Sequence, residues 1–98
     1  MAASETTSCA NRLRVLADET RLMVIRQLMR GPMHVGEINA AMQVESTLLS
    51  HHLKVLRDAG LVLAQRDGKA VLYRLAPDVA VGEDRAVNLG CCVLSFED

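Results

Sequence analysis

The sequence predicts a mainly helical α+β domain in which about four helices are followed by a β-hairpin. Three observations favour this fold class. Apolar residues recur at helical spacing from the N-terminus to about residue 59. An Asp-Gly pair then separates two β-prone runs, which is a strong local signal for a hairpin. The 98 residues are 50% hydrophobic but include only one Tyr and one Phe, so we expect a single core of aliphatic side chains.

The first two helices are predicted from their apolar stripes and end signals. Ser4 is expected to cap a helix that runs to about Leu16, with Leu13 and Leu16 on its buried side. Asp18 is a favourable N-cap for the second helix, and the run Arg30-Gly31-Pro32 ends it. The apolar stripe of the second helix is Leu22, Ile25, Leu28 and Met29.

The third and fourth predicted helices are joined by a tight connection at residues 43–45. The third is short, with Val35, Ile38 and Met42 as its apolar stripe. Ser46 is expected to cap the fourth, which continues to about Ala59. Its packing face carries Leu48, Leu49, His52, Leu53, Val55, Leu56 and Ala59, and His52 there is expected to be a satisfied core histidine. Its opposite face is polar and carries Ser46, Thr47, Ser50, His51, Lys54, Arg57 and Asp58.

After Gly60 the apolar residues no longer recur at helical spacing. Residues 61–66 and 70–75 flank Asp67-Gly68-Lys69 and are predicted to pair as a hairpin. A short helix, a tight turn, an amphipathic helix and a hairpin form the order of a winged helix-turn-helix. In that arrangement the polar helix face enters a major groove, while the hairpin reaches the flanking DNA as a wing. Beyond Pro77, residues 85–96 look more extended than helical.

The charge distribution supports a DNA-binding surface, although the net charge of the chain is −1. Residues 46–75 carry five cations and two acids, whereas residues 76–98 carry one cation and five acids. Affinity for DNA follows the contacting face rather than the total charge. The residues expected to contact double-stranded DNA are Ser46, Thr47, Ser50, His51, Lys54, Arg57, Arg66, Lys69 and Arg74.

Three ordered runs, at residues 16–22 (LADETRL), 50–62 (SHHLKVLRDAGLV) and 66–75 (RDGKAVLYRL), resemble the ArsR/SmtB family of repressors. The resemblance covers about residues 10–76. It implies a homodimer that binds an inverted-repeat operator and releases it when an inducer binds or oxidises the protein. We therefore predict a winged helix-turn-helix DNA-binding domain at residues 1–76 and a C-terminal tail with sensor cysteines at residues 77–98.

Inducer sites of known members of that family are absent at the matching positions. Residues 35–42 hold no Cys-x-Cys motif, and residues 77–98 hold no His for a zinc-type site. The remaining candidates are Cys9, Cys91 and Cys92. Trivalent arsenic and antimony favour three thiolates, because soft ions select sulfur ligands. The sequence therefore favours As(III) or Sb(III) as an inducer, with no obligatory cofactor.

Other interpretations of the same cysteines stay open. An odd number of cysteines in a reducing compartment is expected as free thiols. Cys91 and Cys92 can converge only where the tail bends, for which Gly90 is suited, because neighbours in a strand point to opposite faces. The thiols could instead sense oxidants, and a bridge from Cys9 to a tail cysteine is less strained than one between neighbours. A purely structural alternative is that all three are small buried side chains.

Several classes of protein are disfavoured by the sequence. No apolar run is long enough to span a membrane, and the N-terminus lacks a secretory signal, so a cytoplasmic protein is expected. No nucleophile has a base placed beside it, so an enzyme is not expected. The neutral charge and acidic tail leave a second hypothesis, a winged-helix module that binds protein and no DNA.

Overall fold

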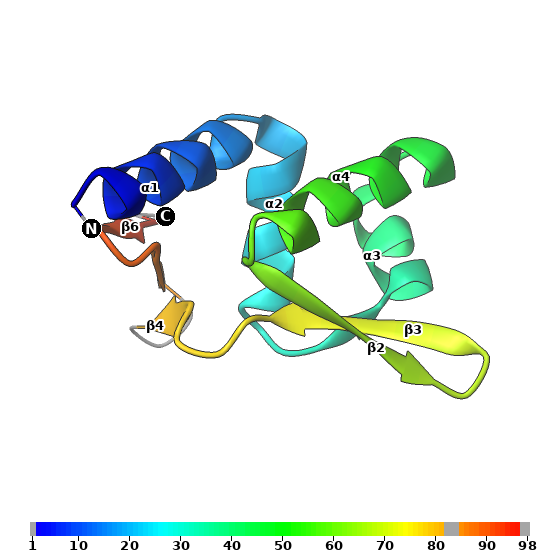
Figure 1. Ribbon diagram of the computed structural model, residues 1–98. Coiled ribbons are helices and arrows are strands. Elements are labelled where there is room, and N and C mark those ends of the chain that lie inside the picture. The colour runs from blue at the N-terminus through cyan, green and yellow to red at the C-terminus, as the bar shows by residue number, and fades with distance from the viewer. Residues whose placement is uncertain (1, 82–84, 97–98) are drawn as a thin grey trace.

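The structure is a computed structural model that describes residues 2–81 and 85–96, with side chains from Ser8 onward. Apart from the short strand β1, which lies between α2 and α3, the strands follow the helices along the chain (Figure 1). The helices are α1 (Ala2–Leu16), α2 (Glu19–Leu28), α3 (Val35–Met42) and α4 (Ser46–Asp58). One antiparallel sheet has the order β1-β3-β2, from β1 (Met33–His34), β2 (Val62–Asp67) and β3 (Ala70–Leu75). The predicted fold class is confirmed.

The helix ends agree with the predictions at α2 and differ at α1 and α4. The Asp18 carboxylate accepts a hydrogen bond from the Arg21 backbone N–H at 3.0 Å, which confirms the expected cap of α2. Helix α1 begins at Ala2, so Ser4 lies within it, and the predicted capping side chain of Ser4 lies outside the described residues. The predicted cap Ser46 is wrong. Glu45 caps α4 instead, because its carboxylate accepts from the Leu48 N–H at 2.8 Å.

The core is aliphatic, as predicted, and is formed mainly by α2 and α4. Their side chains Val24, Ile25, Leu49, Leu53 and Leu56 are at most 1% exposed. Burial of this kind supplies about 1.5–3 kcal/mol per large aliphatic side chain. Helix α4 is therefore fixed along one face, and its position is set by the core rather than by its own helix propensity.

Two leucines predicted to pack are exposed in the structure. Leu13 of α1 is 46% exposed, and Leu48 of α4 is 48% exposed. Leu48 shares the first turn of α4 with Leu49, which is 0% exposed, but it points about 100° away from Leu49 around the helix. Helical spacing assigned both leucines to a packing face, but the core covers a narrower arc of each helix than the apolar pattern predicts.

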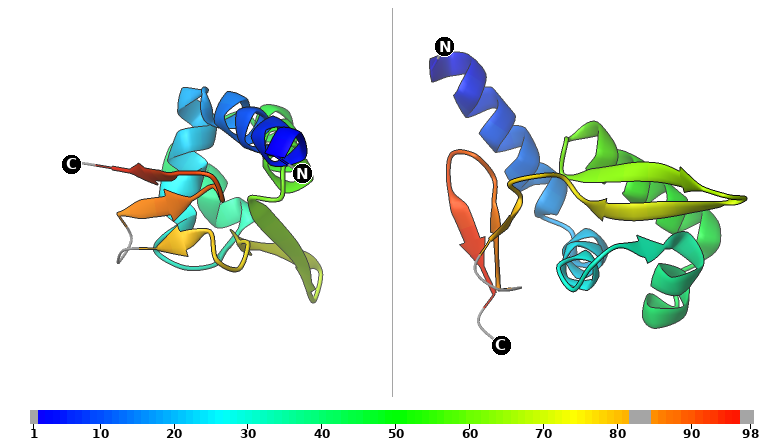
Figure 2. Two further views of the ribbon diagram at one scale, coloured as in Figure 1. Left: turned by 60° about the vertical axis from the view of Figure 1, so that its left-hand side comes forward. Right: turned by 90° about the horizontal axis from the view of Figure 1, so that it is seen from below.

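The predicted hairpin is confirmed and forms a two-stranded projection at the side of the molecule (Figures 1 and 2). Its register runs from Val62 opposite Leu75 to Asp67 opposite Ala70. The turn is therefore the pair Gly68-Lys69, with Asp67 inside the strand, and Gly68 has a φ of +65°. We call residues 62–75 the wing. Its base includes the half-buried Tyr73, which packs against the core.

The C-terminal tail forms a second antiparallel sheet beside α1, away from the tip of the wing (Figures 1 and 2). Its strands are β4 (Ala80–Val81), β5 (Ala86–Asn88) and β6 (Val93–Ser95), in the order β4-β5-β6. The extended conformation predicted for residues 85–96 is confirmed. Val87 and Leu89, at 0% and 2% exposed, belong to the same buried cluster as α2 and α4. No helix in the described part of the chain is long and apolar enough to cross a membrane.

Candidate DNA-binding surface and cysteine cluster

The polar face of α4 is open to solvent in the structure. All six residues predicted there to contact DNA are exposed: Ser46, Thr47, Ser50, His51, Lys54 and Arg57. Lys54 Nζ donates to Asp58 Oδ2 at 2.8 Å, one helical turn further on, and this contact lowers the pKa of Asp58. Both side chains are more than half exposed, so this surface pair contributes little to stability and leaves the lysine available to other anions.

Helix α4 is held on its other side by a polar contact as well as by leucines. His52 is 6% exposed, and its Nδ1 accepts a hydrogen bond from Arg21 Nε at 3.0 Å. Arg21 also donates to the Val15 carbonyl at 3.2 Å, which links α4 to the end of α1. The prediction that His52 is a satisfied core histidine is confirmed. The role of Arg21 could not be read from the sequence, because its partner lies 31 residues away.

The wing presents its three predicted DNA-contacting cations in different directions. Arg66, Lys69 and Arg74 are all exposed. In the register of the hairpin Arg66 lies opposite Val71, whereas Arg74 lies opposite Leu63. Side chains alternate between the faces of a strand, so Arg66 and Arg74 lie on opposite faces of the ribbon. Lys69 lies in the turn at the tip. The structure therefore spreads these cations around the wing instead of gathering them into one patch.

His34 connects the wing to the start of α3. Its Nε2 is 2.7 Å from Asp67 Oδ2, and its Nδ1 is 3.0 Å from Glu37 Oε1. The hydrogen bonds to Asp67 and Glu37 raise the pKa of His34. Glu37 also accepts from the His34 backbone N–H at 2.8 Å, which helps to satisfy the N-terminus of α3. His34 thus combines a local contact at the start of α3 with a long-range contact to the wing.

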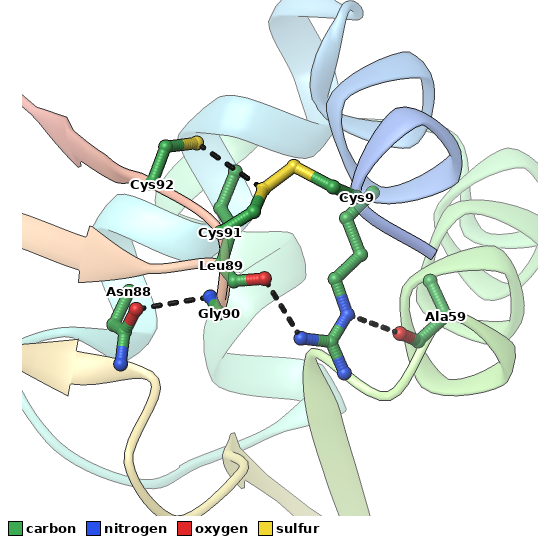
Figure 3. The surroundings of a disulfide bond; sticks show 8 residues. Cys9, Ala59, Asn88, Leu89, Gly90, Cys91 and Cys92 are labelled. Carbon is green, nitrogen blue, oxygen red and sulfur yellow. Dashed lines mark hydrogen bonds between the residues drawn. A yellow bond between two sulfur atoms is a disulfide. The ribbon is translucent and has the colours of Figure 1, made fainter. Parts of the chain in front are cut away.

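The three predicted sensor cysteines lie together. Cys9 of α1 forms a disulfide with Cys91 of the tail, with their Cα atoms 6.0 Å apart. The free thiol of Cys92 lies 3.8 Å from Cys91 Sγ, and the three Sγ atoms lie within 4.8 Å of one another (Figure 3). The expectation of three free thiols is therefore wrong for Cys9 and Cys91. The pairing found is one of the two bridges, from Cys9 to either tail cysteine, that were considered for oxidant sensing.

The two neighbouring cysteines converge because they lie in a bend and not in a strand. Residues 89–92, which we call the cysteine turn, connect β5 to β6. The Leu89 N–H donates to the Cys92 carbonyl at 2.8 Å, and Gly90 has a φ of +95°, a conformation that favours glycine. Cys91 and Cys92 are exposed and Cys9 is half-buried. A soluble thiol reagent or ion can therefore reach the cluster, which excludes the alternative of three buried side chains.

Comparisons with known proteins support the same fold and class. Residues 18–63 match the model of the ArsR family of bacterial regulatory proteins. The transcriptional regulator NmtR of Mycobacterium tuberculosis is 41% identical over 66 residues, which are 67% of this chain and 55% of that protein. The arsenical resistance operon repressor of Escherichia coli is 39% identical over 67 residues, which are 67% of this chain and 57% of that protein.

A solved structure extends the match to most of the fold. The homodimeric winged helix-turn-helix DNA-binding domain of a possible ArsR-family transcriptional regulator from Mycobacterium bovis has a TM-score of 0.73 and 32% identity. The match covers 76% of this chain and 69% of that chain. The chain spans a little over half the length of the two curated relatives above, one a transcriptional regulator and the other an operon repressor. From the order of its elements, its sequence match and its solved relatives, this chain is a member of the ArsR family of bacterial regulatory proteins.

Proposed function

We propose that this protein is a homodimeric transcriptional repressor that leaves its operator when a thiol-reactive inducer engages Cys9, Cys91 and Cys92. The observation that carries the inducer part is the convergence of three sulfur atoms within 4.8 Å from segments far apart in sequence. The DNA-binding part rests on an amphipathic helix whose polar face is exposed while Leu49, Leu53 and Leu56 anchor it. Within this proposal, residues 1–76 bind DNA and residues 77–98 complete the sensor.

For DNA binding, α4 lies in a major groove with Ser46, Thr47, Ser50 and His51 near base edges or phosphates. Lys54 and Arg57 bind phosphates, because a long cationic side chain reaches the backbone from the groove. Arg66, Lys69 and Arg74 of the wing contact the flanking backbone or minor groove. A homodimer places two such units side by side, so its operator is an inverted repeat whose symmetry matches that of the protein. The cytoplasm is the compartment in which this regulator meets DNA.

The favoured inducer is trivalent arsenic or antimony. Three thiols replace the three hydroxyl groups of arsenous acid, which forms three As–S bonds and releases three waters. The Cys9–Cys91 bond must first be reduced by two equivalents of a cellular thiol, which leave as their own disulfide, to supply two of these ligands. The exposed cysteine turn allows entry, and the soft thiolate ligands select a soft ion over hard cations.

Oxidant sensing is the second candidate, and the Cys9–Cys91 disulfide favours it. In this chemistry one thiolate attacks a peroxide oxygen to give a sulfenic acid and water. The second thiol then attacks that sulfur, closing the disulfide and releasing a second water. This route uses two cysteines, whereas a three-coordinate metalloid needs all three.

A variant of Cys92 therefore distinguishes metalloid sensing from oxidant sensing. The reduced protein should be titrated against a palindromic operator by fluorescence anisotropy, with and without arsenite or hydrogen peroxide. Under the metalloid proposal, wild-type protein binds one arsenic per chain and releases DNA, and Cys92→Ser loses that arsenite response. Release by peroxide would survive in Cys92→Ser and be lost in Cys9→Ser. The control is Ser8→Ala, an exposed neighbour of Cys9 that should behave as wild type.

Three outcomes would contradict the proposal. Arsenite release that persists in Cys92→Ser would exclude the three-thiolate site. Release that survives replacement of all three cysteines by serine would exclude any thiol sensor. Failure to bind any duplex, together with salt-independent binding to a protein partner, would favour the protein-interaction module instead.

A further inference from the structure

The strongest unassigned feature is a single arginine, Arg12, that hydrogen-bonds both to the cysteine turn and to the end of α4. Arg12 of α1 donates from Nε to the Ala59 carbonyl at 3.2 Å, directly after the last residue of α4. It also donates from its NH1 nitrogen to the Leu89 carbonyl at 3.1 Å, two residues before Cys91. One guanidinium thus joins the end of the DNA-reading element to the cysteine turn, although these points are separated by 47 and 77 residues from Arg12.

Two glycines make room for the guanidinium. A Cβ added at Gly60 would lie 3.2 Å from the NH2 nitrogen of Arg12, and one added at Gly90 would lie 3.6 Å from NH1. Both glycines have positive φ, +79° at Gly60 and +95° at Gly90, so their backbone conformations also favour glycine. The end of α4 and the cysteine turn are therefore shaped alike around the same planar group, and small displacements of either will change its hydrogen bonds.

Arg12 is also joined to the sensor cysteines through its own helix. Cys9 lies three residues before Arg12 on α1, which places both on neighbouring positions of one helical face. Cys9 bonds to Cys91, and Leu89 precedes Cys91 in the same turn. The sulfur bond and the Arg12–Leu89 hydrogen bond thus connect the same two segments. Opening the disulfide, or inserting a metalloid between the sulfurs, changes the spacing across which Arg12 reaches.

We propose that Arg12 is the positioning residue that transmits the chemical state of the cysteine cluster to α4. The inference rests on the proposed function, because it requires a thiol-dependent change in DNA affinity. When the cysteine turn moves relative to α1, Arg12 cannot keep both carbonyls at hydrogen-bond distance. The C-terminal end of α4 then loses the cation that satisfies its terminal carbonyl. A shift of the helix end alters how its polar face meets the groove.

A merely structural role makes a different prediction. If Arg12 only satisfies two terminal carbonyls, its removal lowers stability but leaves the effect of the inducer on DNA affinity unchanged. If Arg12 transmits the signal, its removal reduces the coupling between two sites that each still function. Coupling is the ratio of operator Kd with and without inducer, and it typically amounts to about 5- to 150-fold in allosteric proteins.

The test compares wild type, Arg12→Gln, Arg12→Lys and Arg14→Gln as full-length chains. Arg14 is an exposed cation on the same helix and serves as the matched control. Operator Kd is measured by anisotropy for reduced protein, for protein with arsenite and for protein oxidised with hydrogen peroxide. Arsenite stoichiometry and the fraction of Cys9–Cys91 disulfide are measured in parallel by absorbance and mass spectrometry.

We expect wild type and Arg14→Gln to show the full inducer effect. Both Arg12 variants should still bind arsenite and still form the disulfide, but their Kd ratio should fall to within about twofold of unity, well below the coupling of wild type. Lysine keeps the charge but lacks the planar fork that spans two carbonyls, so it should not rescue coupling. It also serves as the second variant if glutamine prevents folding.

A reciprocal measurement checks the same coupling from the other site. Operator DNA should change the equilibrium constant for Cys9–Cys91 formation in a glutathione buffer. The factor should equal the ratio of operator Kd between oxidised and reduced protein, and the change should disappear in Arg12→Gln. An inducer response in both Arg12 variants equal to that of wild type would overturn the inference and leave the proposed function standing. No inducer response in wild type would overturn both.

Discussion

The part of the molecule that we propose reads DNA, namely α2, α3, α4 and the wing, and the C-terminal sheet are built in different ways. The strands of the wing have six residues each, whereas the strands of the tail have two or three. Helix α4 places three leucines at 0% exposure, while Val93 of β6 is 56% exposed. The family match covers residues 18–63 and includes most of the first part and none of the second. The difference indicates that a frame shared with the ArsR family carries a C-terminal sheet of shorter strands, which lies outside the family match.

The largest expected effect comes from comparing a buried side chain of α4 with an exposed side chain of the tail. Leu53→Ala should lower the free energy of unfolding by about 2–5 kcal/mol, because it opens a cavity in the packed face of α4. Val93→Ala should change it by no more than about 0.5 kcal/mol, because that side chain is already mostly in water. Urea unfolding followed by circular dichroism measures both. Equal losses from the two variants would show that Val93 is packed as firmly as Leu53.

The covalent link between the two regions should have the next largest effect. The Cys9–Cys91 disulfide joins residues 82 positions apart, so its reduction should lower stability by about 2–4 kcal/mol through the greater freedom of the unfolded chain. Urea unfolding with and without dithiothreitol measures this difference. The double variant Cys9→Ser/Cys91→Ser should match the reduced protein and should not respond to reductant. A reductant response in that variant would assign the effect to other chemistry.

A smaller effect is expected on the proposed DNA-binding surface itself. Arg57→Gln should weaken binding to all duplexes alike, because a phosphate contact carries no base information. The slope of log Kd against log salt should fall by about one unit. Arg14→Gln, an exposed cation outside the proposed surface, should leave the slope unchanged. A loss confined to one operator sequence would instead place Arg57 at a base edge.

The smallest effect concerns how the wing is held. The pKa of His34 is raised by its contacts with Asp67 and Glu37, so those contacts stabilise the fold fully below the ordinary histidine pKa of 6.5. Their contribution is lost as pH rises through the raised pKa. Amide hydrogen exchange at the tip of the wing should therefore quicken over that range after correction for the intrinsic rate. His34→Gln should abolish this transition, whereas an unchanged transition in that variant would assign it to another group.

The sequence was most informative where one period extends over many residues. Helices α2 to α4 and the wing follow from regular apolar spacing and from Asp67-Gly68, because these signals depend on neighbours in the chain. The tail gave only an extended pattern, since strands as short as Ala80–Val81 are too brief to show alternation. The cap of α4 was misplaced because Glu45 is an unusual N-cap beside a more favourable Ser46.

The candidate sites were predictable by residue type and less so by geometry. The polar face of α4 and the three cysteines could be singled out, because their chemistry is visible in the sequence. Contacts between residues far apart in the sequence could not be predicted. Arg12 and Arg21 looked like ordinary helix cations, but one reaches Leu89 and the other reaches His52. Spacing on one helix gives no information about the carbonyl or ring nitrogen that a different element presents.

The scarcity of aromatic residues has a practical consequence. The chain has no tryptophan, and its one tyrosine, Tyr73, lies in the wing, where it pairs with Met33 of β1 and Ala64 of β2. Its ultraviolet emission therefore arises from a single, known position beside the surface that we expect to meet DNA. Unlabelled protein can report optically on the base of the wing, and no fluorescent dye needs to be attached to the cysteines.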